Sequence, residues 1–543
     1  MFATWEISFQ AIQEKNPKAA DLLLVCGFFD HEDIQEQLLR RGLKLETDGM
    51  SILGIILKAL RMLTVNIDFI LAESIRTLFS YSLVKRGSRN DSFSIHPLVH
   101  SWARLRLKSE PQKEVERARE AFQILVTGVH NTKQFERGTE DWIFEQQIML
   151  HADAVTKHTV RFLAVDNMKT QDGAYKLGDV YMWHGRTGKA MEWYGRALEG
   201  REKALGINHP DTLATVHAIA VGFNNQGQYD KALEWYGRAL AGEEKAMGVD
   251  HPEALATVHN MAFVFMNQGQ YDKALEWYGR ALAGEEKAMG VDHPGTLTTV
   301  HNIACLYMNQ GQFDKALEWY GRALSGREQA LGIDHPHTLA TVYGMASVFN
   351  HQGQYDKALE WYGRALAGAE KALGCDHPCT LTTVHGMASV FNHQRQYDKA
   401  LEWYQRALAG RSKSEGVDHP STLTTVHGMA SVFNHQGQYD KALEWYGRAL
   451  AGREKVLGVD HPHTLASVSS MASVFDNQGR YHKALELYGR VLARREKSLG
   501  VSHPSTQSTI RCLINLHERT RQTEHAQRLQ ARLYREAPNS PSN

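Results

Sequence analysis

Cysteine and histidine are the residues of this chain whose types and spacing could do chemistry. The tightest group is Cys375-Asp376-His377-Pro378-Cys379, where two thiols and an imidazole could ligate Zn²⁺. Aligned segments elsewhere in the chain carry Val or Ile at the position of Cys375, and Asp, Glu, Gly, His or Ser at that of Cys379. The cluster therefore indicates chance drift, and we predict no metal site.

The sequence also contains no motif for phosphate binding or for covalent catalysis. The string Gly185–Lys189 (GRTGK) is the nearest approach to a phosphate-binding loop, but it is too short and no Ser or Thr follows its lysine. No serine, cysteine or carboxylate stands beside a base in the way that an activated nucleophile needs. We predict no catalytic residue, no cofactor and no enzyme activity.

Composition narrows the class of partner. The 543 residues carry 61 basic and 61 acidic side chains, so there is no overall basic charge of the kind that marks nucleic-acid or membrane binding. The longest apolar stretch, Ser51–Ala72, is interrupted by Lys58, Arg61 and Asp68, and the amino terminus resembles no secretion signal. Five scattered cysteines favour reduced thiols. We expect a cytoplasmic protein with neither nucleic acid nor membrane as partner.

An internal repeat must position these residues. His-Pro pairs recur every 42 residues, beginning at His209, His251, His293, His335, His377, His419, His461 and His503. Between them the chain nearly copies itself, and YDKALEWYGRAL at Tyr229–Leu240 returns unchanged from Tyr271, Tyr355 and Tyr439. We therefore expect each 42-residue copy to form one structural unit.

Each unit predicts two helices. In the copy from His251, Val258, Met261, Ala262 and Phe265 form the apolar stripe of a first helix, and Ala274, Tyr278, Ala281 and Leu282 that of a second. Gly269 between them suits the positive φ of a helix end. We expect Asp272 to cap the second helix and His293-Pro294 to start the next unit.

These residues at this spacing resemble the tetratricopeptide repeat. The 42-residue length and the junction Arg453–Pro462 (REKVLGVDHP) resemble the variant found in kinesin light chain. The resemblance implies an all-α fold, a tetratricopeptide repeat solenoid in which helix hairpins stack into a right-handed superhelix with a concave face. One copy departs from the pattern, because Arg395 replaces the inter-helix glycine at an expected cost of ~1 kcal/mol.

Residues 1–120 contain no repeat. The predicted elements are helices at Ile12–Gly27, Asp33–Arg41, Ser51–Leu63 and Ala72–Tyr81, two short strands within Ser82–Ile95, and a helix at Pro97–Leu107. This order predicts a small winged-helix-like domain. Thr4–Phe9 (TWEISF) and Phe93–Arg104 (FSIHPLVHSWAR) resemble the end of the nucleotide-binding region of NB-ARC (NLR- or STAND-type) immune-type receptors of filamentous fungi.

That resemblance implies a nucleotide phosphate contact for His96; the alternative is a turn histidine that starts the next helix. The phosphate loop of the family has no match, so the chain resembles such a receptor without its ATPase, as a natural short form or through an incomplete gene model. The basic stretch Lys85, Arg86, Arg89, Arg104, Arg106 and Lys108 is interpreted as a solvated face, with DNA binding as the alternative.

The two resemblances together divide the chain. The predicted parts are a winged-helix-like remnant of an NB-ARC region (1–120), a helical connector or degenerate repeat (121–166), eight tandem 42-residue repeats (167–502), a capping helical hairpin (503–537) and a disordered tail (538–543).

By the tetratricopeptide resemblance, a few first-helix positions of each copy line the concave face. The predicted groove residues are His217, His259, Asn260, His301, Asn302, Asn350, His351, His385, Asn392, His393, His427, Asn434 and His435. They offer donors and acceptors with almost no fixed charge, which favours an extended peptide. The alternative is that they are solvated helix faces. Successive row histidines lie one hairpin apart, too far to share a metal.

We expect a protein–protein interaction scaffold that binds a protein or peptide partner. The favoured hypothesis is the partner- or ligand-sensing part of an NB-ARC-type receptor in non-self recognition or cell death signalling. A kinesin light chain-like cargo adaptor is the alternative, although no long heptad coiled coil is found through which it would hold a motor. A regulatory ATPase is disfavoured by the missing phosphate loop. The sequence leaves open whether the chain self-associates.

Overall fold

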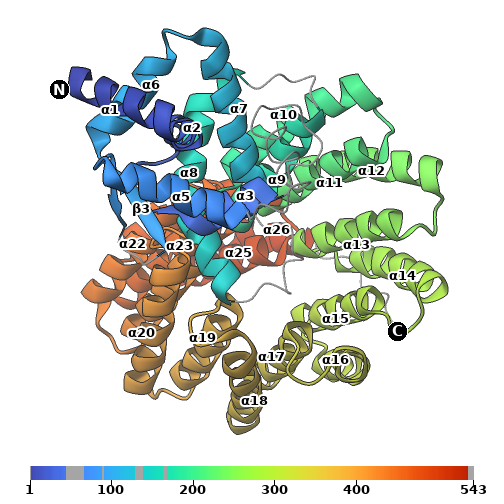
Figure 1. The fold of residues 1–543 in the computed structure, drawn as a ribbon. Coiled ribbons are helices and arrows are strands. Elements are labelled where there is room, and N and C mark those ends of the chain that lie inside the picture. The colour runs from blue at the N-terminus through green and yellow to red at the C-terminus, as the bar shows by residue number, and fades with distance from the viewer. Residues whose placement is uncertain (1, 45–66, 88–90, 129–138, 163–167, 536–543) are drawn as a thin grey trace. The chain divides into compact units, whose positions relative to one another are not determined.

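The computed structural model describes residues 2–44, 67–87, 91–128, 139–162 and 168–535. The chain forms two compact units. The first comprises Met1–Val180 and Glu192–Ala204, and the second comprises Tyr181–Met191 and Leu205–Asn543. Most of the described residues of both units lie in helices (Figure 1), and in the second unit the repeat pattern predicts them.

The first unit combines helices with a small antiparallel sheet. Its strands β1 (Ile34–Gln35), β2 (Val84–Arg86) and β3 (Ser92–Ile95) lie in the order β1-β3-β2. Val84 faces Ile95 across the predicted hairpin, which the structure confirms. The helices are α1 (Phe2–Lys15), α2 (Pro17–Cys26), α3 (Glu36–Lys44), α5 (Ile67–Ser80), α6 (Pro97–Leu107), α7 (Pro111–Gly128), α8 (Thr139–Thr159), the short 3-10 helix η1 (Val160–Phe162), α9 (Met168–Trp183) and α10 (Thr187–Leu205); α9 and α10 each have residues in both units.

Two of the predicted elements of this unit are wrong in detail. Ile12–Gly27 is not one helix, because Pro17 cannot continue α1 and the side chain of Asn16 instead accepts a hydrogen bond from the N–H of Ala19 at the start of α2. Asp33–Arg41 is not all helix, because Ile34–Gln35 pairs with β3 and α3 begins at Glu36. The predicted helix Ser51–Leu63 and the predicted tail, 538–543, lie outside the described residues.

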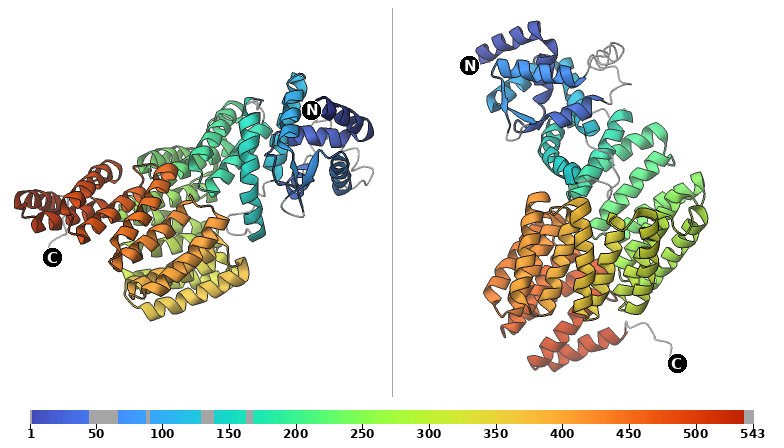
Figure 2. Two further views of the ribbon diagram at one scale, coloured as in Figure 1. Left: turned by 90° about the vertical axis from the view of Figure 1, so that its left-hand side faces the viewer. Right: turned by 60° about the horizontal axis from the view of Figure 1, so that its bottom comes forward.

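The second unit is a stack of helix hairpins, one per 42-residue copy (Figure 2). The first helices lie on the inner side in Figure 1 and the second helices on the outer side. The first helices are α11 (Pro210–Asn225), α13 (Pro252–Asn267), α15 (Pro294–Asn309), α17 (Pro336–His351), α19 (Pro378–His393), α21 (Pro420–His435) and α23 (Pro462–Asn477). The second helices are α12 (Tyr229–Met247), α14 (Tyr271–Ala288), α16 (Phe313–Leu331), α18 (Tyr355–Leu373), α20 (Tyr397–Ser414), α22 (Tyr439–Leu457) and α24 (Tyr481–Leu499). α25 (Pro504–Arg519) and α26 (Thr523–Arg535) occupy the segment predicted as a cap.

Each first helix begins at its His-Pro pair. His293 is the N-cap of α15, and its Nδ1 accepts a hydrogen bond of 3.1 Å from the N–H of Gly295, while Pro294 takes the first helical position. Proline suits that position because its missing N–H would have no partner inside the helix. The role of the proline was predictable, whereas the histidine as cap is a feature that the sequence analysis missed.

The inter-helix turn needs a positive φ, as predicted. Gly269 has φ 71° and Arg395 has φ 60°, a region that costs a residue with a Cβ some free energy. The predicted cap of the second helix is wrong. α14 begins at Tyr271 after Gln270, whose side chain makes no capping bond, and Asp272 lies inside the first turn, where a carboxylate meets the positive end of the helix dipole.

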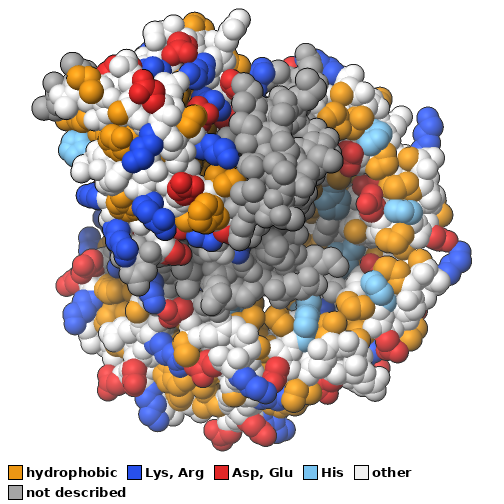
Figure 3. Space-filling view, in the orientation of Figure 1, with side chains coloured by type: hydrophobic (Ala, Val, Ile, Leu, Met, Phe, Trp, Pro, Cys, Tyr) orange, Lys and Arg blue, Asp and Glu red, His pale blue; other side chains and the backbone are white. Residues whose placement is uncertain are grey.

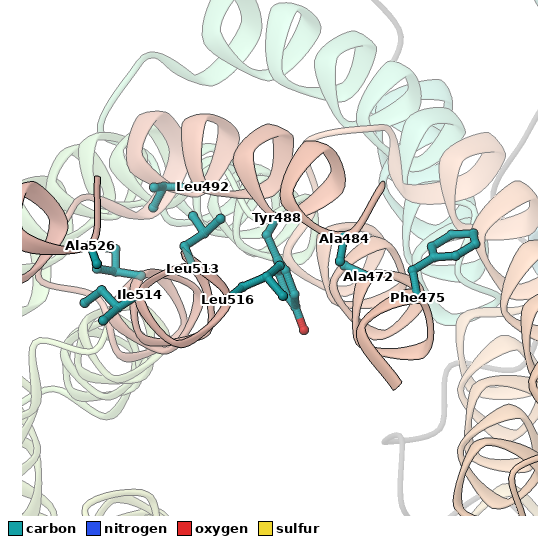
Figure 4. Close-up of a cluster of buried hydrophobic side chains, with 10 residues drawn as sticks. Ala472, Phe475, Ala484, Tyr488, Leu492, Leu513, Ile514, Leu516 and Ala526 are labelled. Carbon is teal, nitrogen blue, oxygen red and sulfur yellow. The ribbon is translucent and has the colours of Figure 1, made fainter. Parts of the chain in front are cut away.

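A tyrosine and small residues hold neighbouring hairpins together. The tyrosine at the Tyr278 position is between 0% and 4% exposed in every copy from Tyr236 to Tyr488. Alanines such as Ala274 and Ala281 are fully buried and let the helix backbones approach. The last such cluster, shown in Figure 4, packs Tyr488 and Leu492 against Leu513, Leu516 and Ala526 of the final two helices. Clusters of this kind therefore join each hairpin to its neighbours.

Candidate functional site

Histidines of the first predicted row bridge neighbouring repeats. Nδ1 of His217 lies 2.8 Å from Oγ1 of Thr257 in the next repeat, and Nδ2 of Asn260 donates to Nε2 of His217 over 2.9 Å. The ring also meets Tyr236 edge-on, with centroids 5.1 Å apart. His259 makes the same contacts one repeat later, to Thr299 at 2.7 Å and Asn302 at 2.8 Å.

Burial keeps this row neutral. It lowers the pKa of His217 and His259 to about 4, so the rings are uncharged near neutral pH. In that state Nε2 accepts from the asparagine and Nδ1–H donates to the threonine, which matches the distances. Burial, reinforced by Arg327, Arg411 and Arg453, lowers the pKa of His301, His385 and His427 to about 3.

The later members of the row keep looser contacts of the same kind. Oγ1 of Thr341 lies 3.4 Å from Nδ1 of His301, and Oγ1 of Thr425 lies 3.5 Å from Nδ1 of His385. Nε2 of His427 lies 3.1 Å from Oγ of Ser470. All five histidines of the row are half-buried, so the row presents ring edges rather than whole rings to solvent.

The two other predicted rows form a second ladder. Nδ1 of His393 lies 3.0 Å from Oδ1 of Asn350 in the preceding repeat, and Nδ1 of His435 lies 3.0 Å from Oδ1 of Asn392. Asn350 and Asn392 are buried, and Asn434, half-buried, accepts from Asn477 over 3.1 Å. The amides are thus held in place, and the histidines that they orient lie at the surface.

The exposed members of the predicted site are therefore few. His351, His393 and His435 are exposed and lie at the carboxyl ends of α17, α19 and α21, one in each of three consecutive repeats. The ring of His351 stacks on Phe313 with a 10° angle between planes, and that of His393 lies 6.2 Å from Tyr355. Histidine side chains are visible among the repeats at the right of Figure 3.

Arginines buried between repeats were not predicted from the sequence. Nη1 of Arg327 donates to the main-chain oxygen of His337 at 2.9 Å and to Thr341 at 2.8 Å, and Nη2 donates to Thr298 at 3.1 Å. Arg411 and Arg453 repeat the pattern. The signal was present, because this position of the repeat changes between Glu, Arg and Ala while the position before it is Gly and the position after it is Glu in all but one copy each.

Two copies carry glutamate at that buried position. Glu243 and Glu285 are 2% and 5% exposed, and burial raises the pKa of each carboxyl to about 7. Their contacts to Thr257 and Thr299 place them beside the histidine bridges, because the same threonines accept from His217 and His259. The state of charge between these repeats therefore changes near neutral pH.

His96 and Gly185–Lys189 have simple structural roles. Nδ1 of His96 accepts from the N–H of Leu98 over 3.2 Å at the start of α6, the cap that every His-Pro pair of the repeats makes. Gly185, with φ 69°, forms the turn between α9 and α10, as its alignment with the repeat predicts. The nucleotide contact of His96 stays a prediction.

Three further predictions concern the cysteine cluster, the basic stretch and a membrane span. Cys375 is exposed and Cys379 half-buried, and within the described ranges no three His, Cys, Asp or Glu side chains converge as a metal site would need. Arg106 of the basic stretch pairs with Glu6 and Glu110, and Arg104 contacts His158. Among the helices that the structure describes, none is long and apolar enough to cross a bilayer.

Comparison with known proteins places the repeats in a family. The tetratricopeptide repeat model matches residues 171–245, 253–329, 338–413, 382–455 and 421–497, more than half of the chain, and a second model of that name matches 301–372. A domain of unknown function matches residues 10–112. A nucleotide-binding leucine-rich repeat (NLR)-like protein of Hyaloscypha variabilis is 29% identical over 221 residues, 40% of this chain and 19% of that protein, so the chain spans about a fifth of its length.

Two solved structures show similar repeats. A putative kinesin light chain with nearly identical TPR-like repeats from Podosopora anserina is 28% identical, covers 36% of this chain and 93% of its own, and has a TM-score of 0.32. A STAND protein with a tetratricopeptide repeat sensor from Pyrococcus horikoshii is 13% identical, covers 91% and 72%, and has a TM-score of 0.40. On the extent of the family match, this chain belongs to the tetratricopeptide repeat family.

Proposed function

We propose that the first helices of the repeats bind an extended segment of a partner protein, and that the chain is the partner-sensing part of an NB-ARC (NLR-type) receptor in non-self recognition or cell death signalling. Tetratricopeptide repeat arrays are non-catalytic protein–protein interaction scaffolds, and this chain carries such an array. The receptor context is supported by the likeness to the NLR-like protein of Hyaloscypha variabilis and by the motifs around Phe93–Arg104.

One observation carries the binding proposal. His351, His393 and His435 are exposed at equivalent positions of three consecutive repeats, and buried asparagines fix the rings of His393 and His435. With Nδ1 donating to the amide oxygen, Nε2 of His393 and of His435 is left as an acceptor toward solvent. Burial lowers the pKa of His393 and His435, so the two fixed rings favour the neutral form, which suits the N–H groups of an extended backbone better than a carboxylate or phosphate.

The test compares two faces of the same repeats. The full chain with H351A, H393A and H435A is used as bait beside wild type and a control with E360A, E402A and E444A, which alters exposed residues of the second helices. Bound proteins are identified by mass spectrometry. We expect proteins that bind wild type and the glutamate control to be lost from the histidine variant. Equal capture by all three baits contradicts binding through this row.

The identity of a captured protein tests the receptor context separately. Components of an immune-type or cell death complex support the proposed sensor, whereas the heavy chain of a motor supports the cargo adaptor. A protein that depends on the histidine row but belongs to neither class retains the binding surface and removes the receptor assignment.

A further inference from the structure

Three His-Pro loops pack onto three inter-helix turns that lie far earlier in the sequence. Nε2 of His461 lies 3.2 Å from the main-chain oxygen of Asn225, and Nε2 of His503 lies 3.1 Å from that of Asn267. Both pairs are 236 residues apart, which is between five and six repeats. The array has therefore wound through one turn and touches itself along this line.

Glycine at the covered turns is required by these contacts. A Cβ on Gly227 would lie 2.7 Å from Cδ of Pro462, and one on Gly269 would lie 2.5 Å from Cδ of Pro504. At Gly185 the ring of His419 and Cδ of Pro420 would each be 3.1 Å away. Carbon atoms do not approach so closely without displacement, so a side chain at these turns would push the His-Pro loop away.

Inter-helix turns and His-Pro loops of the same kind recur elsewhere on the array without making this contact. A Cβ at the turns of Gly311, Gly353, Gly437 or Gly479 would meet none of the described residues within 4 Å, and their φ values of 73° to 74° match those of the covered turns. At the earlier repeats, Pro210, Pro252 and Pro294 of the first three His-Pro loops are exposed. One edge of turns and one edge of loops thus remain open, and their sequences nearly copy those of the paired ones.

Arginine interrupts the open edge of turns. Arg395 takes the place of glycine with φ 60°, so its Cβ points where a docking proline would lie, and Arg521 does the same at φ 58° in the last hairpin. The internal contact uses three consecutive turns. Any three consecutive turns between Gly311 and Arg521 include Arg395 or Arg521, so no register of that length is free of an arginine.

We propose that the exposed turns between Gly311 and Gly479 fit the His-Pro loops of a second copy of this chain, and that Arg395 blocks this self-association. The occupant is a second copy because the complementary surface is the chain's own loop edge, and the internal contact already shows the fit. Loops at His209, His251 and His293 would meet turns at Gly353, position 395 and Gly437, because α9 and α10 of the second copy then follow α26 of the first and the superhelix continues in the register of the internal contact. Such a contact joins unlike faces and would propagate into a filament.

Sedimentation velocity of the full chain over a range of concentrations tests the proposal. We expect R395G to self-associate with a dissociation constant at least about tenfold lower than that of the wild type. R395N is the matched control, because asparagine tolerates the positive φ as arginine does not but keeps the Cβ that blocks the proline. It should sediment like wild type.

A second substitution separates this edge from any other face. In R395G/G353R the obstacle moves to the neighbouring turn, so the assembly gained by R395G should be lost again. The proposal is overturned if R395G sediments like wild type, if R395N assembles as R395G does, or if assembly persists in R395G/G353R. Circular dichroism of each variant confirms that it is folded, and none of the outcomes depends on the proposed groove.

Discussion

Asn260 donates a hydrogen bond of 2.9 Å to Nε2 of His217 in the preceding repeat, and the same ring reaches Thr257 through Nδ1. The side chains predicted to line a groove therefore also hold one repeat to the next. Their neutrality follows from burial, which lowers the pKa of His217 to about 4. Both ring nitrogens of His217 and His259 are engaged, whereas His393 and His435 are exposed and bond through Nδ1 alone, so the latter two combine the two roles.

Removing a bridging histidine should destabilise the array. We expect H217A to lower the free energy of unfolding by ~1–3 kcal/mol, because the hydroxyl of Thr257 and the amide of Asn260 lose a half-buried partner. H482A, at an exposed histidine of α24, is the control and should change stability little. Urea denaturation followed by circular dichroism measures both. Equal stability of the two variants would refute the bridging role.

The buried glutamates give the array a defined pH dependence. Burial raises the pKa of Glu243 and Glu285 from 4.5 to about 7 in the folded chain, so folding favours the protonated forms. Their contribution to stability is greatest below pH 4.5 and is lost as the pH rises toward 7. We expect E243Q/E285Q to be more stable than wild type at pH 8, by about 1–3 kcal/mol for each residue, and the difference to shrink as the pH falls toward 4.5.

Thermal melts of the wild type and E243Q/E285Q across this pH range check the expectation. E276Q, at an exposed position of α14, serves as the control and should follow the wild type at every pH. A difference that stays constant from pH 5 to pH 8 would show that the buried carboxyls do not titrate in this range.

Truncating a core tyrosine should have a large and local effect. Tyr320 is 1% exposed and packs between Ala304, Ala316 and Val348 of neighbouring helices. We expect Y320A to cost ~3–5 kcal/mol, since a cavity opens where the hairpins meet. Because each repeat contacts chiefly its neighbours, the array should then unfold in two steps. Y481A, at a tyrosine that is 37% exposed, should retain a single transition in the same denaturation experiment.

The contact between successive windings should control the compactness of the array. H461A/H503A removes two helix caps and two bonds to the earlier turns, whereas H251A/H293A removes two caps alone. Each lost cap costs ~1 kcal/mol, so both variants should lose similar stability. Small-angle X-ray scattering should show a larger radius of gyration for H461A/H503A only. An unchanged radius would mean that the winding does not depend on these histidines.

Much of the repeat fold could be predicted from the sequence, since a period that nearly copies itself fixes both helices, the turn at Gly269 and the burial of Tyr278. The cap by His293 was missed because it depends on the rotamer of a residue that is uncommon at helix starts. The predicted Asp272 cap failed for the opposite reason, because a favourable residue type lies one position inside the helix and cannot reach the first N–H groups.

Contacts between repeats were harder to predict than contacts within one. The rows of histidine and asparagine could be aligned from the sequence, but their hydrogen bonds depend on the offset between stacked hairpins, as between His393 and Asn350. The contact of His461 with Asn225 depends on a small rotation per repeat that accumulates over 236 residues. Neither quantity is encoded in a residue type, so both require the packed structure.

The central claim is that a partner protein binds at the carboxyl ends of the first helices, where His351, His393 and His435 lie. Photo-crosslinking tests this claim most directly. Benzoylphenylalanine is placed at position 393 of the full chain, or at position 402 on an exposed part of α20, in the cells that make the chain. Mass spectrometry then identifies the crosslinked segments. We predict crosslinks from position 393 to a segment of another protein and none to that protein from position 402. Crosslinks from position 402 alone, or equally from both, would contradict the account.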